Sequence, residues 1–241
     1  MRRWWLTLFP LPKPCCFCTT PVRSFAFSSV WKQMCLSCQE QFFPINGPVC
    51  QVCGRPMTEE DLSVCIDCRQ LDSSTWVTNR SVVLYKGQAK KVIQWFKYQG
   101  LERLAIPLGL WMAESCYHYY RRVPLSLITF VPLHPNRLHE RGFNQAELLA
   151  QVISQRLGLP VKEILVRERE TFSQSHRSRK ERLQALQHVF KVSNRIDPGW
   201  LRQQHILIVD DVYTTGSTLR ECARPLRQAN VRQIFSVTFA R

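Results

Sequence analysis

The sequence lacks any hydrophobic run that approaches the roughly 18 apolar residues of a membrane span. Its start superficially resembles a signal peptide, but Pro10, Pro12 and Pro14 interrupt it and no small-residue cleavage site follows. Acidic residues are scarce as well, because 18 of them stand against 33 basic residues, for a formal charge of +15. We therefore expect a cytoplasmic protein without a membrane span. The basic excess favours a polyanionic partner, nucleic acid or a phosphorylated ligand, over a charge that only keeps the protein soluble.

Periodic apolar stretches are also rare before residue 72, so this part of the chain needs another source of folding free energy. It contains nine of the 11 cysteines, and eight of these are arranged as four Cys-x-x-Cys pairs. The pairs are Cys15/Cys18, Cys35/Cys38, Cys50/Cys53 and Cys65/Cys68. Two thiolates with this spacing bind one metal, and two pairs complete a tetrahedral Zn²⁺ site. The pattern predicts a zinc-binding domain at 1–72, a double zinc ribbon with two structural Zn²⁺ ions.

The way in which the cysteine pairs combine is not fixed by their spacing. Sequential pairing, the first pair with the second and the third with the fourth, is favoured, and a crossed arrangement stays open. Cys16 could substitute for a neighbour in the first site. A disulfide scaffold is disfavoured, because the rest of the chain is typical of a cytosolic protein, where thiols are kept reduced.

Beyond residue 72, apolar periodicity alternates between the strand and helix types. The expected strands are 76–85, 126–131, 161–166, 189–192, 206–209 and 234–239, and the expected helices are 88–99, 101–122, 144–157 and 215–228. The second helix should bend or restart at Pro107. Cys116 and Cys222 fall in helical patterns and should be buried. Such alternation predicts an α/β domain over 73–241, a parallel sheet with helices on both faces.

The strand at 206–209 leads into the most informative motif of the chain. It ends in Asp210 and Asp211, and a hydroxyl-rich loop then opens the next helix. Open parallel sheets bind ligands at the carboxyl ends of their strands, and backbone N–H groups at a helix N-terminus bind anions. The anion-binding candidates are Thr214, Thr215, Gly216, Ser217 and Thr218. The motif suits a ribose 5-phosphate, with the acids on the sugar hydroxyls, better than a capped turn with two solvated acids.

This motif resembles the loop that binds phosphoribosyl pyrophosphate (PRPP) in type I phosphoribosyltransferases. The resemblance implies PRPP binding, and Mg²⁺ would bridge the sugar hydroxyls and the pyrophosphate. Thr214 stands where enzymes of this superfamily that act on purine bases often have an acid, which helps to deprotonate the base. The catalytic residues therefore stay unassigned.

A second motif follows the strand at 126–131. Two prolines form a turn, and Arg137 and Arg141, both able to hold a phosphate, come before the helix that starts near Asn144. In a type I phosphoribosyltransferase the loop that contacts pyrophosphate belongs here. The resemblance makes His134, Arg137, Arg141 and Gly142 candidates, whereas Asn144 is equally well explained as a helix cap.

A third segment, 167–182, is polar, basic and rich in serine, and no periodicity assigns it to an element. In the superfamily a flexible loop at this place closes over PRPP, which makes Gln174 and Arg182 candidates. Its basic residues would equally follow a nucleic-acid backbone, and a solvated charged loop is the third interpretation.

The order of the motifs, together with Lys97-Tyr98-Gln99-Gly100, resembles the ComF family over nearly the whole chain. Ala185 departs from an asparagine that the family often has there. The resemblance implies a cytoplasmic protein of natural competence that handles single-stranded DNA, with other competence proteins such as a ComF helicase as partners. Two hypotheses follow: a DNA-handling module with PRPP as ligand, or an active phosphoribosyltransferase that acts on an unidentified acceptor.

Overall fold

The computed structural model of the chain describes residues 11–25, 28–59, 63–168 and 189–241. Its centre is a sheet of four parallel strands in the order β3-β8-β7-β4. Their bounds are β3 Thr78–Val83, β4 Leu127–Phe130, β7 His205–Val212 and β8 Gln233–Ala240. The apolar run from Ile206 to Val209 is fully buried in β7, as expected for an inner parallel strand. All four carboxyl ends lie at one edge of the sheet, which places the polar segments after β4 and β7 side by side.

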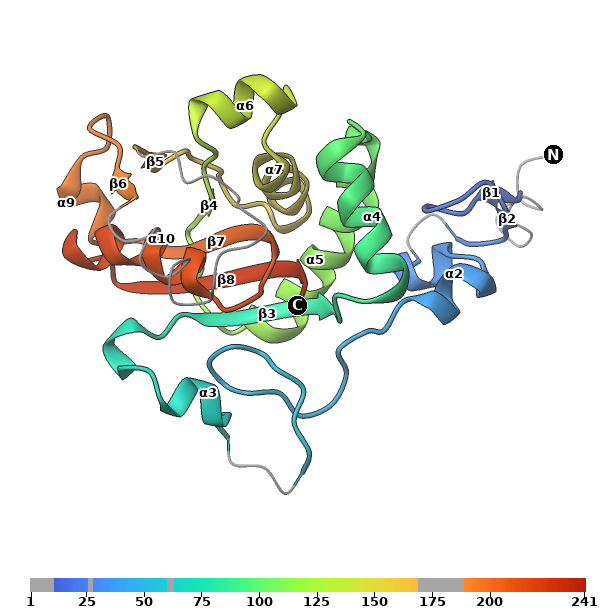
Figure 1. Cartoon of the computed structure of the whole chain (residues 1–241), viewed down its shortest axis with the longest axis horizontal. Coiled ribbons are helices and arrows are strands. Elements are labelled where there is room, and N and C mark those ends of the chain that lie inside the picture. The colour runs from blue at the N-terminus through green and yellow to red at the C-terminus, as the bar shows by residue number, and fades with distance from the viewer. Residues whose placement is uncertain (1–10, 26–27, 60–62, 169–188) are drawn as a thin grey trace, which may run out of the picture.

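Helices cover both faces of this sheet, which confirms the predicted fold class (Figure 1). The helices are α4 Gly87–Tyr98, α5 Ala105–Tyr120, α7 Gln145–Leu157 and α10 Ser217–Gln228. The crossovers through α5 and α10 run in opposite directions along the strand order, so right-handed connections place these helices on opposite faces. α7 packs against α5, and Gly109 allows the close approach, since a Cβ there would lie 2.6 Å from Val152 Cβ.

The helical stretch expected at 101–122 restarts close to Pro107, as predicted: the short 3-10 helix η3 (Glu102–Leu104) comes before α5, which has Pro107 in its first turn. Two other sequence predictions need correction. The expected strand at 161–166 is wrong: Val161 forms only a bridge with Ile128, and β5 (Leu165–Arg167) pairs antiparallel with β6 (Phe190–Val192). Two short helices, α6 (Pro135–Arg141) and α9 (Pro198–Leu201), were not expected, because they are too short to show a period.

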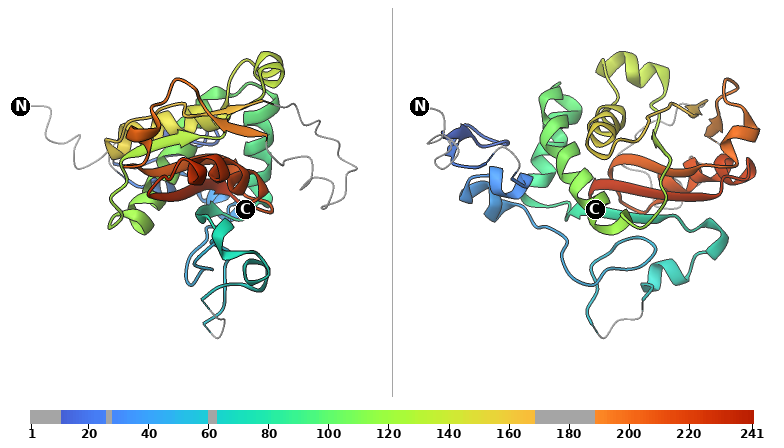
Figure 2. Two further views of the ribbon diagram at one scale, coloured as in Figure 1. Left: turned by 90° about the vertical axis from the view of Figure 1, so that its left-hand side faces the viewer. Right: turned by 180° about the vertical axis from the view of Figure 1, so that it is seen from behind.

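The cysteine-rich part contains only short elements. They are β1 Lys13–Pro14, β2 Pro21–Val22, η1 Val30–Gln33, α2 Leu36–Gln41, α3 Ile66–Arg69 and η2 Ser73–Thr75. Figure 2 shows the segments 48–59 and 63–70 extending below the sheet, whereas α2 packs against α4. Elements this short bury little apolar surface of their own, in keeping with a domain that depends on metal.

This part also covers the outer edge of β3, which would otherwise be an open edge strand. The Ile45 amide donates to the Val82 carbonyl at 2.9 Å, and the Asn79 amide donates to the Val52 carbonyl at 2.7 Å. Phe42 packs edge-on against Trp111 of α5, with ring centroids 5.4 Å apart. The hydrophobic core is therefore continuous between the two predicted domains, and the free edge is protected from pairing with other chains.

Among the described residues, no helix is both long enough and apolar enough to cross a bilayer.

Candidate metal centres and ligand site

The eight paired cysteines form two clusters in the sequential pairing. One contains Cys15, Cys18, Cys35 and Cys38, and the other contains Cys50, Cys53, Cys65 and Cys68. Within each cluster the four sulfur atoms lie within 4.8 Å of one another, and none is in a disulfide. Four cysteine sulfurs are a donor set that fits Zn²⁺. Cys16 belongs to neither cluster, and Cys116 and Cys222 are buried in helices as predicted.

Backbone amides prepare the second cluster for metal. Burial by itself raises the pKa of the Cys50 thiol, but amides of neighbouring residues outweigh it and lower that pKa to about 7. One of them, the Cys65 N–H, points at Cys50 Sγ at 3.3 Å. A Cys50 thiolate is therefore accessible near neutral pH, whereas burial raises the pKa of Cys65 and Cys68 in the absence of metal.

The loop after β7 has the geometry of an anion site. Gly216 adopts φ 72°, and a Cβ at this position would lie 2.2 Å from the Tyr213 hydroxyl, so glycine is required both by conformation and by space. Thr215 Oγ1 and Ser217 Oγ share a hydrogen bond of 2.6 Å. α10 begins at Ser217, so its first N–H groups and these hydroxyls face the same loop.

The two acids at the end of β7 have different surroundings. Lys97 Nζ of α4 lies 2.6 Å from Asp211 Oδ2, a contact of charges rather than a well-aligned hydrogen bond. Burial alone would lower the pKa of Lys97, but the Asp211 and Asp210 carboxylates outweigh it and raise that pKa. Asp210 keeps some exposed surface, yet burial and then the Asp211 charge raise the pKa of its carboxyl to about 7. Near neutral pH the Asp210 carboxyl can therefore change its charge.

The predicted pyrophosphate-loop residues lie on or beside α6. His134 caps this helix and accepts from the Asn136 amide at 3.3 Å, and Gly142 ends it with φ 82°. Arg137 pairs with Glu140 at 2.9 Å, and Arg141 donates to Gln145 at 2.5 Å. Asn144 is the N-cap of α7 and also donates to the Val131 carbonyl at 3.1 Å, so the helix-cap interpretation is the one that the structure supports.

The last turn of α4 also borders the site, beside the end of β7 and α6. The sequence motifs did not predict this. Phe96 is fully buried against Phe143, with ring centroids 5.7 Å apart. The next residue, Lys97, meets Asp211, and Tyr98 lies under Arg141, whose Cζ is 5.5 Å from the ring centroid. Three consecutive side chains thus connect α4 with the segment between α6 and α7, with β7 and with α6. The only sequence signal for a role of this turn is the motif at 97–100, which is part of the resemblance to the ComF family.

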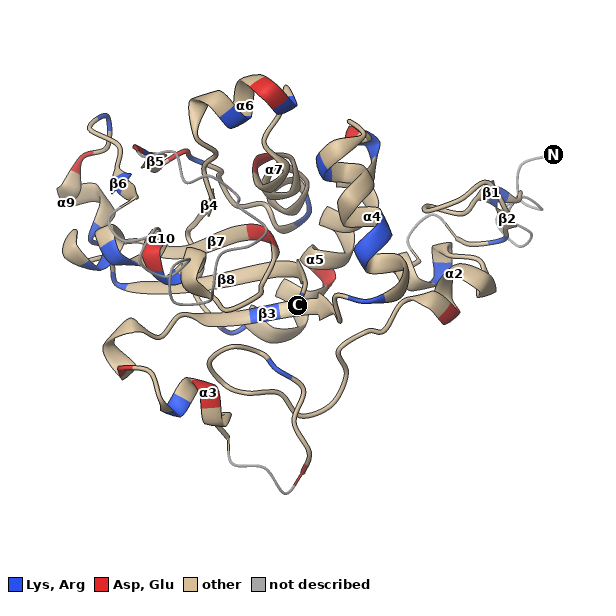
Figure 3. Cartoon of the chain, in the orientation of Figure 1, with Lys and Arg blue, Asp and Glu red and all other residues tan. Residues whose placement is uncertain are grey.

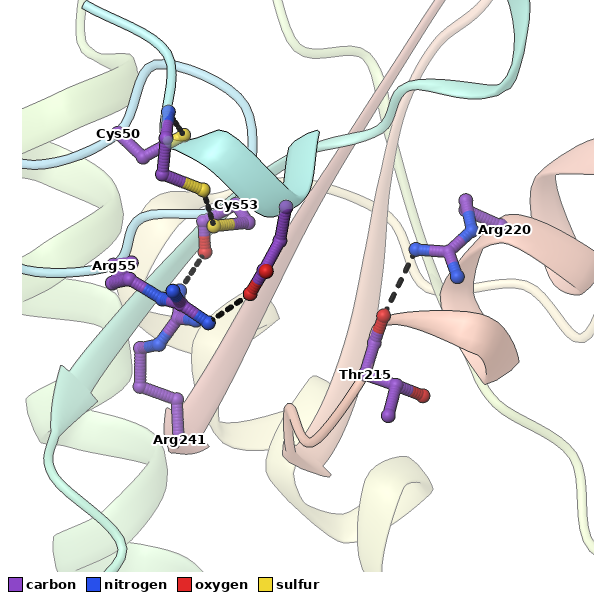
Figure 4. A network of polar contacts seen from close by, with 8 residues as sticks. Cys50, Cys53, Arg55, Thr215, Arg220 and Arg241 are labelled. Carbon is purple, nitrogen blue, oxygen red and sulfur yellow. Dashed lines mark hydrogen bonds and ion pairs between the residues drawn. The ribbon is translucent and has the colours of Figure 1, made fainter. Parts of the chain in front are cut away.

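The second cysteine cluster packs beside the loop 214–218, which follows β7 (Figure 4). Arg241, which follows β8, donates to the Cys53 carbonyl, and its Cζ lies 5.0 Å from the Tyr213 ring centroid. Arg220 donates to the Thr215 carbonyl at 2.9 Å. A pocket of about 240 Å³ between ribbon and loop is lined by both arginines and by Arg55, which pairs with Asp67. Tyr213 therefore connects the metal site with the loop.

Two predicted site residues, Gln174 and Arg182, lie outside the described residues.

Comparisons with known proteins agree with both halves of the chain. A family model for a double zinc ribbon domain matches residues 6–69, and one for a phosphoribosyl transferase domain matches residues 144–241. The chain is 32% identical to competence protein ComFC of Bacillus subtilis, over 81% of this chain and 78% of that protein. It is equally identical to competence protein F of Haemophilus influenzae, over 83% and 87%, and to the DNA utilization protein YhgH of Escherichia coli, over 74% and 77%.

Proposed function

We propose that this chain, which belongs to the family of competence protein ComFC and DNA utilization protein YhgH, binds PRPP with Mg²⁺ and serves DNA uptake or processing in natural competence. The observation that carries the proposal is the placement of Asp210 and Asp211 beside the loop 214–218, at the end of the inner strand β7. Carboxylates and a phosphate-binding loop on one strand end match the two ends of a ribose 5-phosphate.

In this proposal each wall of the site has its own task. The loop N–H groups and hydroxyls bind the 5-phosphate, and the acids bind the ribose hydroxyls. Asp210 or Asp211 would hold Mg²⁺ together with ligand oxygens, and the ion would supply positive charge toward the pyrophosphate. Lys97 neutralises Asp211 before the anionic ligand arrives. Arg137 would exchange its partner Glu140 for the pyrophosphate, and Arg141 would add its charge from the same helix while it keeps its bond to Gln145.

Single-stranded DNA is the proposed macromolecular partner, supported by the distribution of charge. Figure 3 shows basic positions along both α4 and α6, which contain Lys90 and Lys91, and Arg137 and Arg141, respectively. Three further predicted contacts, Arg177, Arg179 and Lys180, are outside the described residues. If the basic residues contact phosphates, the log–log plot of affinity against salt has a slope of about −0.7 per phosphate. Binding measured between about 50 and 200 mM salt tests this, and a flat dependence contradicts it.

An active phosphoribosyltransferase is the second candidate, because the phosphate loop is complete. Its acceptor is not identified, and Thr214 leaves the usual place of a general base without an acid. We also propose a cytoplasmic location, a domain boundary near residue 72, and contacts with other competence proteins such as a ComF helicase.

Two measurements test the proposal. Titration calorimetry with PRPP and Mg²⁺ should give saturable binding, and its absence in correctly folded, zinc-loaded protein contradicts a PRPP site. Pyrophosphate release from PRPP, measured with a panel of nucleobases and with single-stranded DNA, then separates the two candidates. Release that depends on an acceptor supports the transferase, and binding without release supports the DNA-handling module.

A further inference from the structure

Tyr98 is a large aromatic side chain that the fold leaves open to solvent. It is 75% exposed at the end of α4, although its neighbour Phe96 is fully buried. A ring at this place contributes little to the core, because almost none of its apolar surface is removed from water. Tyr117 of α5, 66% exposed, offers a natural comparison in the same chain.

The exposed ring is nevertheless held in place. Phe96 against Phe143 and Lys97 against Asp211 fix the backbone on either side of the last turn of α4. The Arg141 guanidinium lies over the Tyr98 ring and is itself held by its hydrogen bond to Gln145. A ring that is fixed but uncovered loses little conformational entropy when another flat group stacks on it.

The surroundings of Tyr98 are basic. α4 contains Lys90, Lys91 and Lys97 and no acidic residue, and the only acid of α6 is Glu140. Figure 3 shows basic positions on both α4 and α6, and the contact between Arg141 and the Tyr98 ring joins these two helices. A polyanion with flat groups along its length satisfies both features, and single-stranded nucleic acid is the polymer with that chemistry.

We infer that Tyr98 and Arg141 form a base-stacking platform for single-stranded nucleic acid at the rim of the candidate PRPP site. The inference rests on the proposed function. It adds a residue that would contact the bases of the strand, whereas the basic residues would contact its phosphates. A base stacked on Tyr98 lies next to the residue that contacts Asp211, so the strand would pass the mouth of the ribose site. Stacking of this kind accepts every base, because each has a π-face.

The test compares Tyr98→Ala with Tyr117→Ala, a matched change at a similarly exposed tyrosine outside the platform. Two fluorescent probes are titrated by anisotropy in about 50 mM salt: a thymidine oligonucleotide of about 16 nucleotides, and an abasic strand of equal length, which has the phosphates but no bases. Tyr98→Ala should weaken binding of the thymidine strand about 5- to 150-fold, the range for one stacked base. Its binding to the abasic strand should stay at the wild-type value, and Tyr98→Trp should restore or exceed wild-type affinity for the thymidine strand.

Each other outcome overturns the inference. Equal losses in both variants, an equal loss on both probes, or no loss in Tyr98→Ala each exclude a platform at Tyr98. If the wild-type protein binds neither the thymidine strand nor the abasic strand, a nucleic-acid partner is excluded. The PRPP proposal is judged separately by calorimetry of the wild-type protein, so a failure of stacking leaves it standing.

Discussion

Lys97 and Asp211, far apart in the sequence, form an ion pair at the carboxyl edge of the sheet, with Nζ 2.6 Å from Oδ2. Asp211 is buried and Lys97 half-buried. Lys97 places a positive charge beside Asp210 and Asp211, in a site that we propose to bind a polyanion. The ion pair also connects α4 with β7. Its loss should therefore affect both stability and ligand binding.

We expect Lys97→Met to lower the free energy of unfolding by about 3 kcal/mol, because it leaves Asp211 buried without its cation. Urea unfolding followed by circular dichroism measures the change. The double variant Lys97→Met with Asp211→Asn should recover most of it, since no unpaired charge is then buried. Additive losses in the double variant would show that the two side chains are not coupled.

Asp210→Ala combined with Asp211→Ala should abolish PRPP binding while the fold persists. Carboxylates at a strand end in a ligand site serve the ligand more than the core. Calorimetry measures the binding, and circular dichroism together with zinc content checks the fold. The matched control is Asp197→Ala, which removes an acid that caps α9, ahead of the amino end of β7 and away from the loop 214–218. Unchanged PRPP affinity in the folded double variant contradicts the site.

Mg²⁺-dependent PRPP binding should strengthen as the pH rises through 7. The pKa of Asp210 is raised to about 7 from its ordinary 3.8, so below that pH the carboxyl is protonated and neutral, and above it the carboxylate can bind a cation. Affinity is measured between about pH 6 and 8. PRPP phosphates also titrate in this range, so Asp210→Asn is the control. The part of the pH dependence that this variant removes belongs to Asp210, and an identical profile would rule Asp210 out as its source.

Removal of zinc should unfold the cysteine-rich part, because its short elements bury little apolar surface of their own. We further expect the loss of the second metal to weaken PRPP binding, since Arg241 and Tyr213 join that cluster to the phosphate loop. Metal analysis of reduced protein should give two zinc ions per chain, one per cluster. Chelation followed by circular dichroism should leave most of the helix signal of the α/β part.

Two cysteine variants separate the roles of the metals. Cys35→Ser disrupts the first cluster and Cys65→Ser the second, and both are the same chemical change. Only Cys65→Ser should reduce PRPP affinity strongly, because the first cluster packs against α5 and not against the loop. Equal effects of the two variants would mean that the second ribbon has no special connection with the loop.

The sequence by itself determined the features that are local along the chain. Paired cysteines indicate a metal site because the spacing of Cys15 and Cys18 already allows both sulfurs to bind one metal ion. The strand, acids and loop at 206–218 form one continuous segment, so their chemistry is readable without partners. The strand predicted at 161–166 is wrong because strand formation there depends on a distant partner. Leu165 lies in a strand only through its antiparallel pairing with Val192.

Tertiary structure alone decided which distant segments share the site. No periodicity in the sequence indicates that Lys97 contacts Asp211, that Arg141 contacts the Tyr98 ring, or that Arg241 donates to the Cys53 carbonyl. These contacts depend on the strand order β3-β8-β7-β4, which brings the ends of β4, β7 and β8 to one edge with α4 beside them. Side-chain chemistry is a property of each residue, but the proximity of residues on different elements is a property of the crossovers, and these are set by packing of the whole core.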